Sequence, residues 1–354
     1  MKTVVLSGYY GFDNAGDEAV CKSIISDLRA LAPQLNIVVL SNQPEKTALT
    51  YQVSAVNRWK LLPVFKALKN ADLLISGGGS LLQDVSSKYG LYYYLSIILL
   101  AKLLAKPKFL KKPTMIYAQG LGPINLPFNR HISGLILKHV NQATFRDKES
   151  QTLFESLGNN MPKSELVFDP VLGYTNKVDR EMFVKDPYKK TLIFALRGWK
   201  NLSPSLFSHA IDALSEEYQI LLLPLHLGSD DSFAKLIQKE CQSPVEILKG
   251  NYTIDELMAI FSQADATIAM RLHGLIMAAA QKKPLLALSY DPKCASFMHM
   301  IGNPNSIDLD ILTTENLIYH IKHHLFTAQT YQENLANYQQ SAHESARIAL
   351  NLLK

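Results

Sequence analysis

Arg271 and His273 are residues whose types and spacing could do chemistry. They follow residues 266–270, a small, apolar and partly β-branched run that is typical of a short buried strand, and residues 275–280 then have the composition of a tight apolar helix. The carboxyl end of a parallel strand, just before a helix, is where open α/β sheets bind ligands. A guanidinium can hold a phosphate or carboxylate group, and an imidazole can supply a proton near neutral pH. The same residues are equally consistent with a local ion pair and a helix cap.

The first half of the chain has polar residues in equivalent places. Residues 3–7 form a predicted strand, and the glycine-rich loop after it contains Asn14 and Asp17. Residues 73–76 form another, followed by three glycines, Ser80 and Asp84. The glycines do not match the dinucleotide fingerprint, and acidic residues at a helix start would repel a pyrophosphate. We therefore expect these loops to meet sugar hydroxyls, although Asp17 could also be a plain helix cap.

Basic residues follow further predicted strands. Arg146 comes after residues 143–145, Arg197 after residues 191–196, and Lys293 shortly after residues 284–289. A single arginine of this kind is weak evidence, since Arg146 could simply pair with the neighbouring Asp147. Several cations at successive strand ends are better evidence for a small polyanionic ligand.

The elements that must position these residues alternate between strand and helix in both halves. This alternation predicts an α/β protein with two Rossmann-like, doubly wound parallel-sheet domains. We expect an N-terminal domain at residues 1–172, a linker at 173–190, a C-terminal domain at 191–326 and a helical tail at 327–354. The strand ends of the two domains are expected to face each other across a cleft, with hydroxyl-binding groups on the first wall and cations on the second.

Composition restricts the function. The formal charge of +5 fits an anionic small substrate or an anionic membrane surface, and is too weak and dispersed to indicate nucleic acid. Three widely spaced cysteines indicate a reducing cytoplasm, and the N-terminus has no signal-peptide pattern. No metal-ligand cluster is visible, and we expect neither a metal nor another cofactor.

Residues 89–105 are the most apolar segment, and five lysines cluster beside it. They are Lys102, Lys106, Lys108, Lys111 and Lys112. The segment is too poor for a transmembrane helix, but an apolar helix ending in lysines can rest on an anionic bilayer. A core helix with a solvated lysine tail is the alternative.

Five motifs together resemble the polysaccharide pyruvyl transferase family, and most closely its bacterial cell-wall branch. They are Gly8-Tyr9-Tyr10-Gly11-Phe12 with Asn14 and Gly16-Asp17-Glu18, the run from Ser76 to Asp84, Phe145-Arg146-Asp147, Arg271-Leu272-His273-Gly274, and Ser289-Tyr290-Asp291-Pro292-Lys293. The resemblance covers nearly the whole chain and the motifs come in the family order. It implies a GT-B-like fold and the transfer of pyruvate from phosphoenolpyruvate to a sugar as a ketal. In the closest branch the acceptor is a lipid-linked saccharide that contains N-acetylmannosamine, so the enzyme would work in the cytoplasm at the inner face of the plasma membrane.

The resemblance also suggests roles for the residues. Ketal formation needs a proton on the donor methylene carbon, which His273 could supply, and cationic clamps on phosphate and carboxylate. The candidates for donor binding are Arg146, Arg197, Arg271, Leu272, His273 and Lys293, of which Arg146, Arg271 and His273 are the candidate catalytic residues. The candidates for acceptor binding are Asn14, Asp17, Ser80 and Asp84, with Asp17 or Asp84 accepting hydroxyl protons.

Two other functions remain open at this point. A nucleotide-sugar glycosyltransferase of the same architecture commonly has a carboxylate in the helix after the site, and residues 274–283 contain none. A non-catalytic anion or glycan sensor would bind ligands without turnover, which the proton donor His273 makes less attractive.

Overall fold

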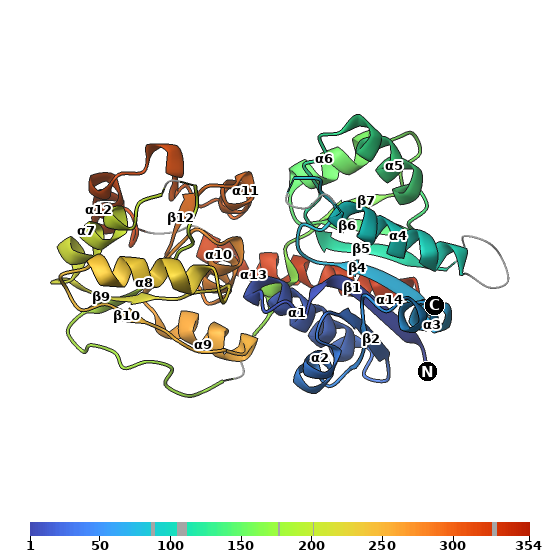
Figure 1. Ribbon diagram of the computed structural model, residues 1–354, viewed down its shortest axis with the longest axis horizontal. Helices are drawn as coiled ribbons and strands as arrows, with labels where there is room; N and C mark the ends of the chain where they lie inside the picture. The colour runs from blue at the N-terminus through green and yellow to red at the C-terminus, as the bar shows by residue number, and fades with distance from the viewer. Residues whose placement is uncertain (86–88, 105–111, 176–177, 201, 328–330) are drawn as a thin grey trace. The chain divides into compact units, whose positions relative to one another are not determined.

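The computed structural model describes residues 1–85, 89–104, 112–175, 178–200, 202–327 and 331–354. The chain forms two compact units (Figure 1), which we describe separately. Unit 1 comprises Met1–Gly173 and Gln339–Lys354, and unit 2 comprises Tyr174–Tyr338. The division expected from the sequence had a linker at residues 173–190 and a separate tail at 327–354. In the structure, Tyr174 and the residues after it belong to unit 2, and the last residues return to unit 1.

Unit 1 contains a seven-stranded parallel sheet in the order β3-β2-β1-β4-β5-β6-β7. Its strands are β1 (Thr3–Tyr10), β2 (Asn36–Ser41), β3 (Ser54–Asn57), β4 (Leu73–Gly77), β5 (Thr114–Gln119), β6 (Gln142–Phe145) and β7 (Ser164–Leu166). Its helices are α1 (Ala15–Leu31), α2 (Pro44–Tyr51), α3 (Leu61–Asn70), α4 (Gly90–Leu103), α5 (Pro127–Leu137), α6 (Lys148–Ser156), the short η1 (Pro170–Gly173) and α14 (Glu344–Asn351).

Unit 2 contains a six-stranded parallel sheet in the order β10-β9-β8-β11-β12-β13. Its strands are β8 (Lys190–Ala195), β9 (Tyr218–Leu222), β10 (Glu246–Ile247), β11 (Ala266–Ala269), β12 (Leu285–Ser289) and β13 (Ser306–Asp308). Its helices are α7 (Pro204–Leu214), α8 (Asp230–Glu240), α9 (Ile254–Gln263), α10 (Leu272–Ala280), α11 (Pro292–Met300), η2 (Leu309–Ile311) and α12 (Thr314–His323), and α13 (Tyr331–Ala342) leads back to unit 1.

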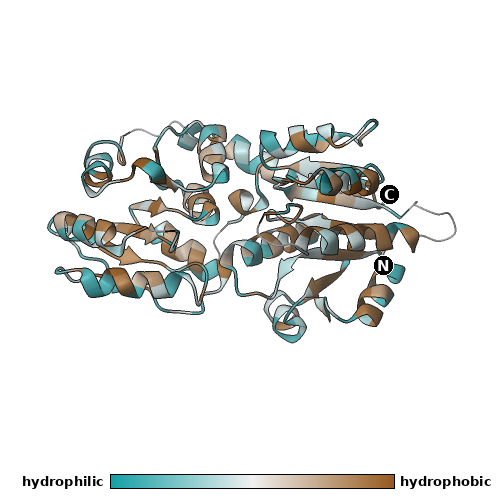
Figure 2. Ribbon diagram, turned by 45° about the horizontal axis from the view of Figure 1, so that its top comes forward, coloured by the Kyte–Doolittle hydropathy of each residue, from teal (hydrophilic) through white to brown (hydrophobic). Residues whose placement is uncertain are grey.

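Each sheet is covered by helices, which confirms the predicted class of two Rossmann-like, doubly wound parallel-sheet domains. In unit 1, α3, α4 and α5 share one core with Val5, Leu74 and Ile116 of the sheet. In unit 2, α7, α8 and α12 pack on one face of the sheet, and α10 packs against β11 and β12. Figure 2 shows the apolar colouring of the strands and inner helix faces and the polar outer faces that this layering requires.

Two polar contacts, one partly buried and one buried, link the returning C-terminal segment to the rest of unit 1. His343, the residue before α14, lies with its Nδ1 atom 2.9 Å from Oδ1 of Asp27 in α1. The hydroxyl groups of Ser345 and Thr144 are 2.8 Å apart, which ties α14 to β6. Because His343 also lies against Gly173, the C-terminal segment is held at the residue where unit 1 ends.

The apolar helix α4 belongs to the core of unit 1, and two of the five lysines expected beside it point inward. Lys102 is 1% exposed and donates hydrogen bonds to the carbonyl of Lys112 and to Oδ1 of Asn141. Lys112 is 8% exposed and donates to the carbonyls of Leu68 and Lys69. Backbone carbonyls therefore satisfy the ammonium groups that we had expected at the surface, and Lys106, Lys108 and Lys111 lie outside the described residues. Among the described helices, none is long and apolar enough to cross a membrane.

Candidate active site

The two central strands of the unit 1 sheet bring Asp17 and Ser80 to one place. The strand order reverses between β1 and β4, and such a reversal is where doubly wound sheets bind ligands. Asp17 lies in the first turn of α1, directly after β1, and Ser80 follows β4. The backbone at Gly79 has a φ of +68°, and a Cβ there would lie 2.5 Å from Oδ1 of Asp17. The triple glycine thus allows the β4 loop to lie against the carboxylate.

Arg146 is a buried side chain that contacts both Asp169 and, in the loop after β4, Ser80. Its Nη1 atom donates to Oδ2 of Asp169 over 2.6 Å, and its Nη2 atom donates to Oγ of Ser80 over 3.2 Å. The side chains of Arg146 and Asp169 are 6% and 2% exposed. We expected the guanidinium of Arg146 to be open to solvent and to bind a phosphate or carboxylate of the ligand, but in the structure it is buried. Arg146 orients Ser80 and neutralises a buried carboxylate.

Asn14 and Asp84 both shape the loops around the site. Asn14 is the N-cap of α1, and its Oδ1 atom accepts from the Gly16 N–H over 3.1 Å. The carboxylate of Asp84 accepts from the backbone N–H groups of Asn125 and Leu126 at 2.9–3.0 Å. Although partial desolvation acts to raise it, these N–H groups hold the pKa of Asp84 below its ordinary value. The structure thus gives Asp84 a loop-holding role that differs from the expected contact with a hydroxyl group.

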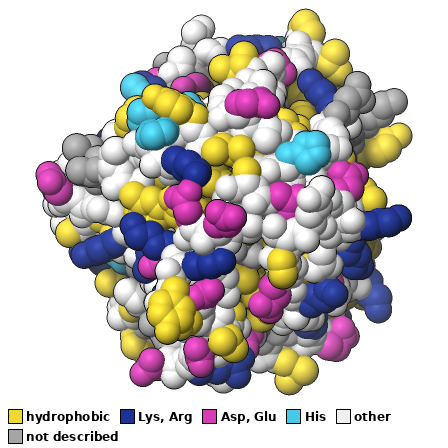
Figure 3. All heavy atoms as spheres, turned by 90° about the vertical axis from the view of Figure 1, so that its left-hand side faces the viewer, with side chains coloured by type: hydrophobic (Ala, Val, Ile, Leu, Met, Phe, Trp, Pro, Cys, Tyr) yellow, Lys and Arg dark blue, Asp and Glu magenta, His cyan; other side chains and the backbone are white. Residues whose placement is uncertain are grey.

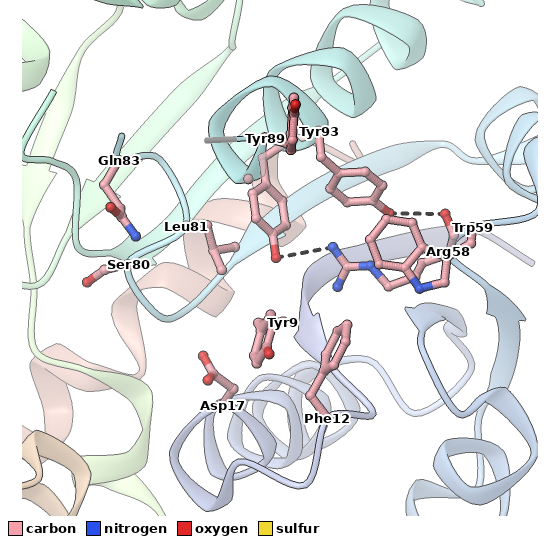
Figure 4. A pocket seen from close by; sticks show the side chains of 12 residues that line it. Tyr9, Phe12, Asp17, Arg58, Trp59, Ser80, Leu81, Gln83, Tyr89 and Tyr93 are labelled. Carbon is pink, nitrogen blue, oxygen red and sulfur yellow. Dashed lines mark hydrogen bonds between the residues drawn. The ribbon is translucent and has the colours of Figure 1, made fainter. Parts of the chain in front are cut away.

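A pocket of about 400 Å³ opens beside Asp17 and Ser80 (Figure 4). Polar side chains line part of it, namely those of Asp17, Arg58, Ser80 and Gln83. Aromatic rings dominate the remainder, and they belong to Tyr9, Phe12, Trp59, Tyr89, Tyr93 and Tyr94. A concave apolar wall with few polar groups is the usual form of a small-molecule site.

Arg58 lies at the base of the aromatic part of the pocket and is 4% exposed. Its guanidinium donates to the carbonyl of Gly8 over 2.7 Å and to the hydroxyl of Tyr94 over 3.2 Å. The guanidinium carbon also lies 4.3–5.4 Å from the centroids of four aromatic rings, those of Phe12, Trp59, Tyr93 and Tyr94. Ring faces and the neutral oxygens of Gly8 and Tyr94 therefore stabilise its charge.

In unit 2 the strand order reverses between β8 and β11, and three consecutive strands there end in cations. Arg197 follows β8, Arg271 follows β11, and Lys293 lies in the first turn of α11 after β12. His273 and Leu272 are half-buried residues at the start of α10. The carboxyl ends of parallel strands lie at the same end of a sheet, so these predicted residues are brought together there.

A carboxylate that the sequence analysis did not identify fixes Arg271. Its Nε and Nη2 atoms donate to the two oxygens of Asp230 over 2.9 and 2.5 Å. Asp230 is the first residue of α8 and is 1% exposed, and it also accepts from the backbone N–H of His226. A two-point contact of this kind sets the plane of the guanidinium before any ligand arrives.

Arg197 and Lys293 each have a local partner. Nη1 of Arg197 donates to the hydroxyl of Tyr290 over 2.9 Å, and its guanidinium lies over the rings of Tyr290 and Trp199 at 5.0 and 5.2 Å. Burial raises the pKa of the Tyr290 hydroxyl, so it remains protonated near neutral pH. Lys293 lies 3.6 Å from Oδ2 of Asp291, the N-cap of its own helix. Lys293 is the more weakly held of the two cations, because its ion pair is long and partly exposed.

Sequence reasoning found the cations and Asp17 but missed Arg58 and Asp230. Arg58 follows a short strand that has no strong pattern, and the nearest sequence signal is Trp59 with the tyrosine run at residues 92–94. Asp230 starts a helix and looks like any acidic residue in a first turn. No group of His, Cys, Asp or Glu that could hold a metal ion occurs among the residues that the structure describes.

Solved structures of similar fold include two bacterial UDP-GlcNAc 2-epimerases. The enzyme from Neisseria meningitidis has a TM-score of 0.63 and 14% identity, covering 100% of this chain and 99% of its own. A putative enzyme from Listeria monocytogenes has a TM-score of 0.66 and 12% identity, covering 99% and 95%. The calicheamicin glycosyltransferase CalG4 has a TM-score of 0.55 and 11% identity, covering 99% and 97%. These similarities show a GT-B-like fold.

Two sequence comparisons bear on the family. No curated protein matches the chain. The model of the polysaccharide pyruvyl transferase family matches residues 14–292, a range that includes the loops of Asp17 and Ser80 as well as Arg271 and His273. This chain therefore belongs to the polysaccharide pyruvyl transferase family.

Proposed function

We propose that this protein transfers the pyruvyl group of phosphoenolpyruvate to two hydroxyl groups of a cell-wall saccharide, forming a ketal and releasing phosphate. The observation that carries the proposal is the row of cations at the strand-order reversal of unit 2, with Arg271 held in one orientation by Asp230. Phosphoenolpyruvate carries a phosphate and a carboxylate, and both groups need cationic donors in fixed positions. We assign Arg197, Arg271 and Lys293 to these contacts, with Leu272 beside them.

The proposed reaction starts with a proton from His273 to the methylene carbon of the donor. Protonation leaves a cationic centre at the adjacent carbon, and one sugar hydroxyl adds there and loses its proton. Phosphate then leaves with its bonding electron pair, and the second hydroxyl adds to the same carbon to close the ketal. Imidazole is the side chain that most often acts as a general acid near neutral pH.

The acceptor is proposed to bind unit 1, where Asp17 is the candidate base for the hydroxyl protons. Asp17 is preferred to Asp84 because Asp17 lines the pocket, whereas Asp84 holds the backbone of Asn125 and Leu126. Ser80 is a candidate hydrogen-bond partner for the sugar, and Arg146 is assigned as the residue that positions Ser80. Asn14 supports the site as the cap of α1.

We propose further that the acceptor is lipid-linked and contains N-acetylmannosamine, and that the enzyme meets it at an anionic membrane surface. Residues 46–71 and 85–146 contain no Asp or Glu. This region includes α3, α4 and α5, which pack side by side. The exposed residues of these helices and of the segments leading into them carry no negative charge. The apolar and basic ones include Lys60, Leu61, Leu62, Lys66, Lys69, Leu99, Leu103, Leu126, Phe128, Leu135 and Lys138.

This lipid-facing surface, α3 with α4 and α5, has the chemistry that an anionic bilayer attracts. By contrast, the face drawn in Figure 3 carries acidic and basic side chains interspersed. The proposal places the enzyme in the cytoplasm at the inner face of the plasma membrane, and the three free cysteines are consistent with a reducing compartment.

Transfer from a nucleotide sugar is the second candidate, because the fold is shared with glycosyltransferases such as CalG4. The test is phosphate release from phosphoenolpyruvate, measured with and without an N-acetylmannosaminyl acceptor. We expect release that requires the acceptor. Acceptor-independent release, or transfer only from a nucleotide sugar, would contradict the proposal, and binding of both ligands without turnover would favour a sensor.

A further inference from the structure

We infer that the aromatic pocket around Arg58 is a sugar-stacking subsite of unit 1, which takes one uncharged pyranose ring. The inference rests on the proposed function only in identifying that ring as part of the acceptor. Nothing in the five sequence motifs points to Arg58, Trp59 or Tyr93, so this subsite adds residues to the site described above.

Part of the aromatic surface of the pocket is exposed. Tyr9 and Phe12 are stacked on each other, with centroids 4.0 Å apart and planes 6° apart, and the ring centroids of Trp59 and Tyr93 are 5.5 Å apart. Trp59 and Tyr89 are 59% and 79% exposed and both line the pocket. Pyranose rings have apolar C–H faces and polar edges, and aromatic surface with a few polar groups matches this pattern.

Arg58 organises these rings. Two of its N–H groups are used by Gly8 and Tyr94, and its guanidinium carbon lies 4.3 Å from the ring centroid of Tyr93 and 5.1 Å from that of Trp59. The indole N–H of Trp59 donates to Oδ1 of Asn42 over 2.9 Å, which fixes the ring from its outer edge. Figure 4 shows Arg58 beside Trp59 and Tyr93, with Asp17 and Tyr9 on the other side of the pocket. The rings are therefore positioned before a ligand enters.

The ligand is an uncharged ring rather than a free anion, for two reasons. Aromatic faces carry partial negative charge and cover the guanidinium, so they disfavour an approaching anion. Asp17 also lines the pocket, and its carboxylate suits hydroxyl donors. A pyranose stacked on the rings would present its hydroxyl edge to Asp17, Ser80 and Gln83, the polar side of the same pocket.

The test is calorimetry with the methyl glycosides of N-acetylmannosamine and N-acetylglucosamine, on the full chain and without phosphoenolpyruvate. Trp59→Ala should weaken binding of the preferred glycoside by roughly fivefold, since one aromatic contact is worth on the order of 1 kcal/mol. Trp59→Phe retains a ring and should stay close to wild type. Tyr188→Ala removes a 94% exposed aromatic ring from unit 2 and should have no effect.

Three results would each overturn the subsite. They are equal binding by wild type and Trp59→Ala, no binding of either glycoside to wild type, and displacement of the glycoside by inorganic phosphate. The donor is absent from these titrations, so a failure of pyruvyl transfer would leave their outcome unchanged. Conversely, the glycoside could bind in calorimetry while the separate turnover assay shows no phosphate release from phosphoenolpyruvate. That result would contradict the proposed function but would still support the subsite.

Discussion

At the residue scale, His273 carries the chemical step of the proposed reaction. His273→Gln keeps a similar volume and a hydrogen-bonding group but cannot deliver a proton to carbon. We expect donor binding to survive and turnover to fall on the order of 10²–10⁴-fold, the usual contribution of a general acid. Donor binding would be measured by calorimetry and turnover by phosphate release on one preparation. Near-normal turnover would show that another group supplies the proton, and Lys293 is the next candidate.

Arg271 tests whether a fixed guanidinium matters more than a positive charge. Arg271→Lys retains the charge but cannot make the two-point contact with Asp230 or with the donor. We expect the affinity for phosphoenolpyruvate to fall roughly tenfold or more, because charge-assisted hydrogen bonds contribute about 1.5–3 kcal/mol.

The control is Arg347→Lys in α14, a side chain that is 51% exposed and pairs with Glu344. Unchanged donor affinity in a folded Arg271→Lys protein would remove Arg271 from the donor site.

At the element scale, the attachment of α14 to α1 depends on the protonation of His343. The hydrogen bond that His343 donates to the carboxylate of Asp27 raises the pKa of His343 above its ordinary value, even though partial burial acts to lower it. A group whose pKa is higher in the folded protein stabilises the fold while it is protonated. Its contribution is therefore full below its ordinary pKa of about 6.5 and is lost as the pH rises through the higher, folded-state value.

His343→Gln should consequently lower stability by about 1 kcal/mol in mildly acidic buffer and by less in alkaline buffer, since solvent screens a side chain that is 39% exposed. Burial raises the pKa of Asp27 as well, so this carboxylate takes up its proton at a higher pH than an ordinary aspartate does. The measurement is the thermal midpoint of both proteins across the pH range. A difference between the two proteins that stays constant with pH would show that His343 acts by packing alone.

The sequence predicts the strands and the polar residues at their ends better than it predicts the distant residues that pair with them. The strand at residues 266–270 and the polar residues after it follow from local composition, because a buried parallel strand must be apolar and its end is where polar groups collect. For this reason the sequence indicated Asp17, Ser80 and Arg271 as candidates, and the structure places each of them after a parallel strand. Their partners could not be found, because Asp230 is 41 residues from Arg271 and Asp169 is 23 residues from Arg146.

Lys102 shows why the sequence pattern does not reveal whether a lysine beside an apolar helix is buried. An ammonium group beside an apolar helix looks like a surface charge, but the neighbouring carbonyl of Lys112 and the amide of Asn141 accept its hydrogen bonds. Burial lowers the pKa of Lys102 to about 8. The aromatic pocket was missed in the same way, since it combines residues from β1 and the loop after it, from the loop after β3 and from α4 that only the fold brings together.

At the scale of the whole molecule, the acid-free region makes membrane attachment testable. Lys60, Lys66 and Lys69 are exposed near or within α3, and each lysine near an anionic surface contributes about 1 kcal/mol. Replacing all three by Glu should reduce co-sedimentation with phosphatidylserine-containing vesicles by tenfold or more. Added salt should weaken the binding of the wild-type protein.

The matched control replaces three exposed lysines of unit 2 by Glu, namely Lys200, Lys239 and Lys249. It makes the same change in net charge, so loss of binding in both triple variants would indicate a general charge effect. Vesicle binding that depends on neither lipid charge nor salt would contradict an electrostatic surface on unit 1.

The proposed ketal transfer requires both units, because we assign the donor to unit 2 and the acceptor to unit 1. The most direct measurement is the product formed from ¹³C-labelled phosphoenolpyruvate and an N-acetylmannosaminyl acceptor, analysed by mass spectrometry and NMR. We expect the acceptor to gain a labelled pyruvyl ketal that bridges two hydroxyl groups, with one phosphate released for each ketal. The His273→Gln protein should form almost no ketal. An unmodified acceptor alongside released phosphate, or a sugar added from a nucleotide donor in place of the ketal, would contradict the proposed transfer.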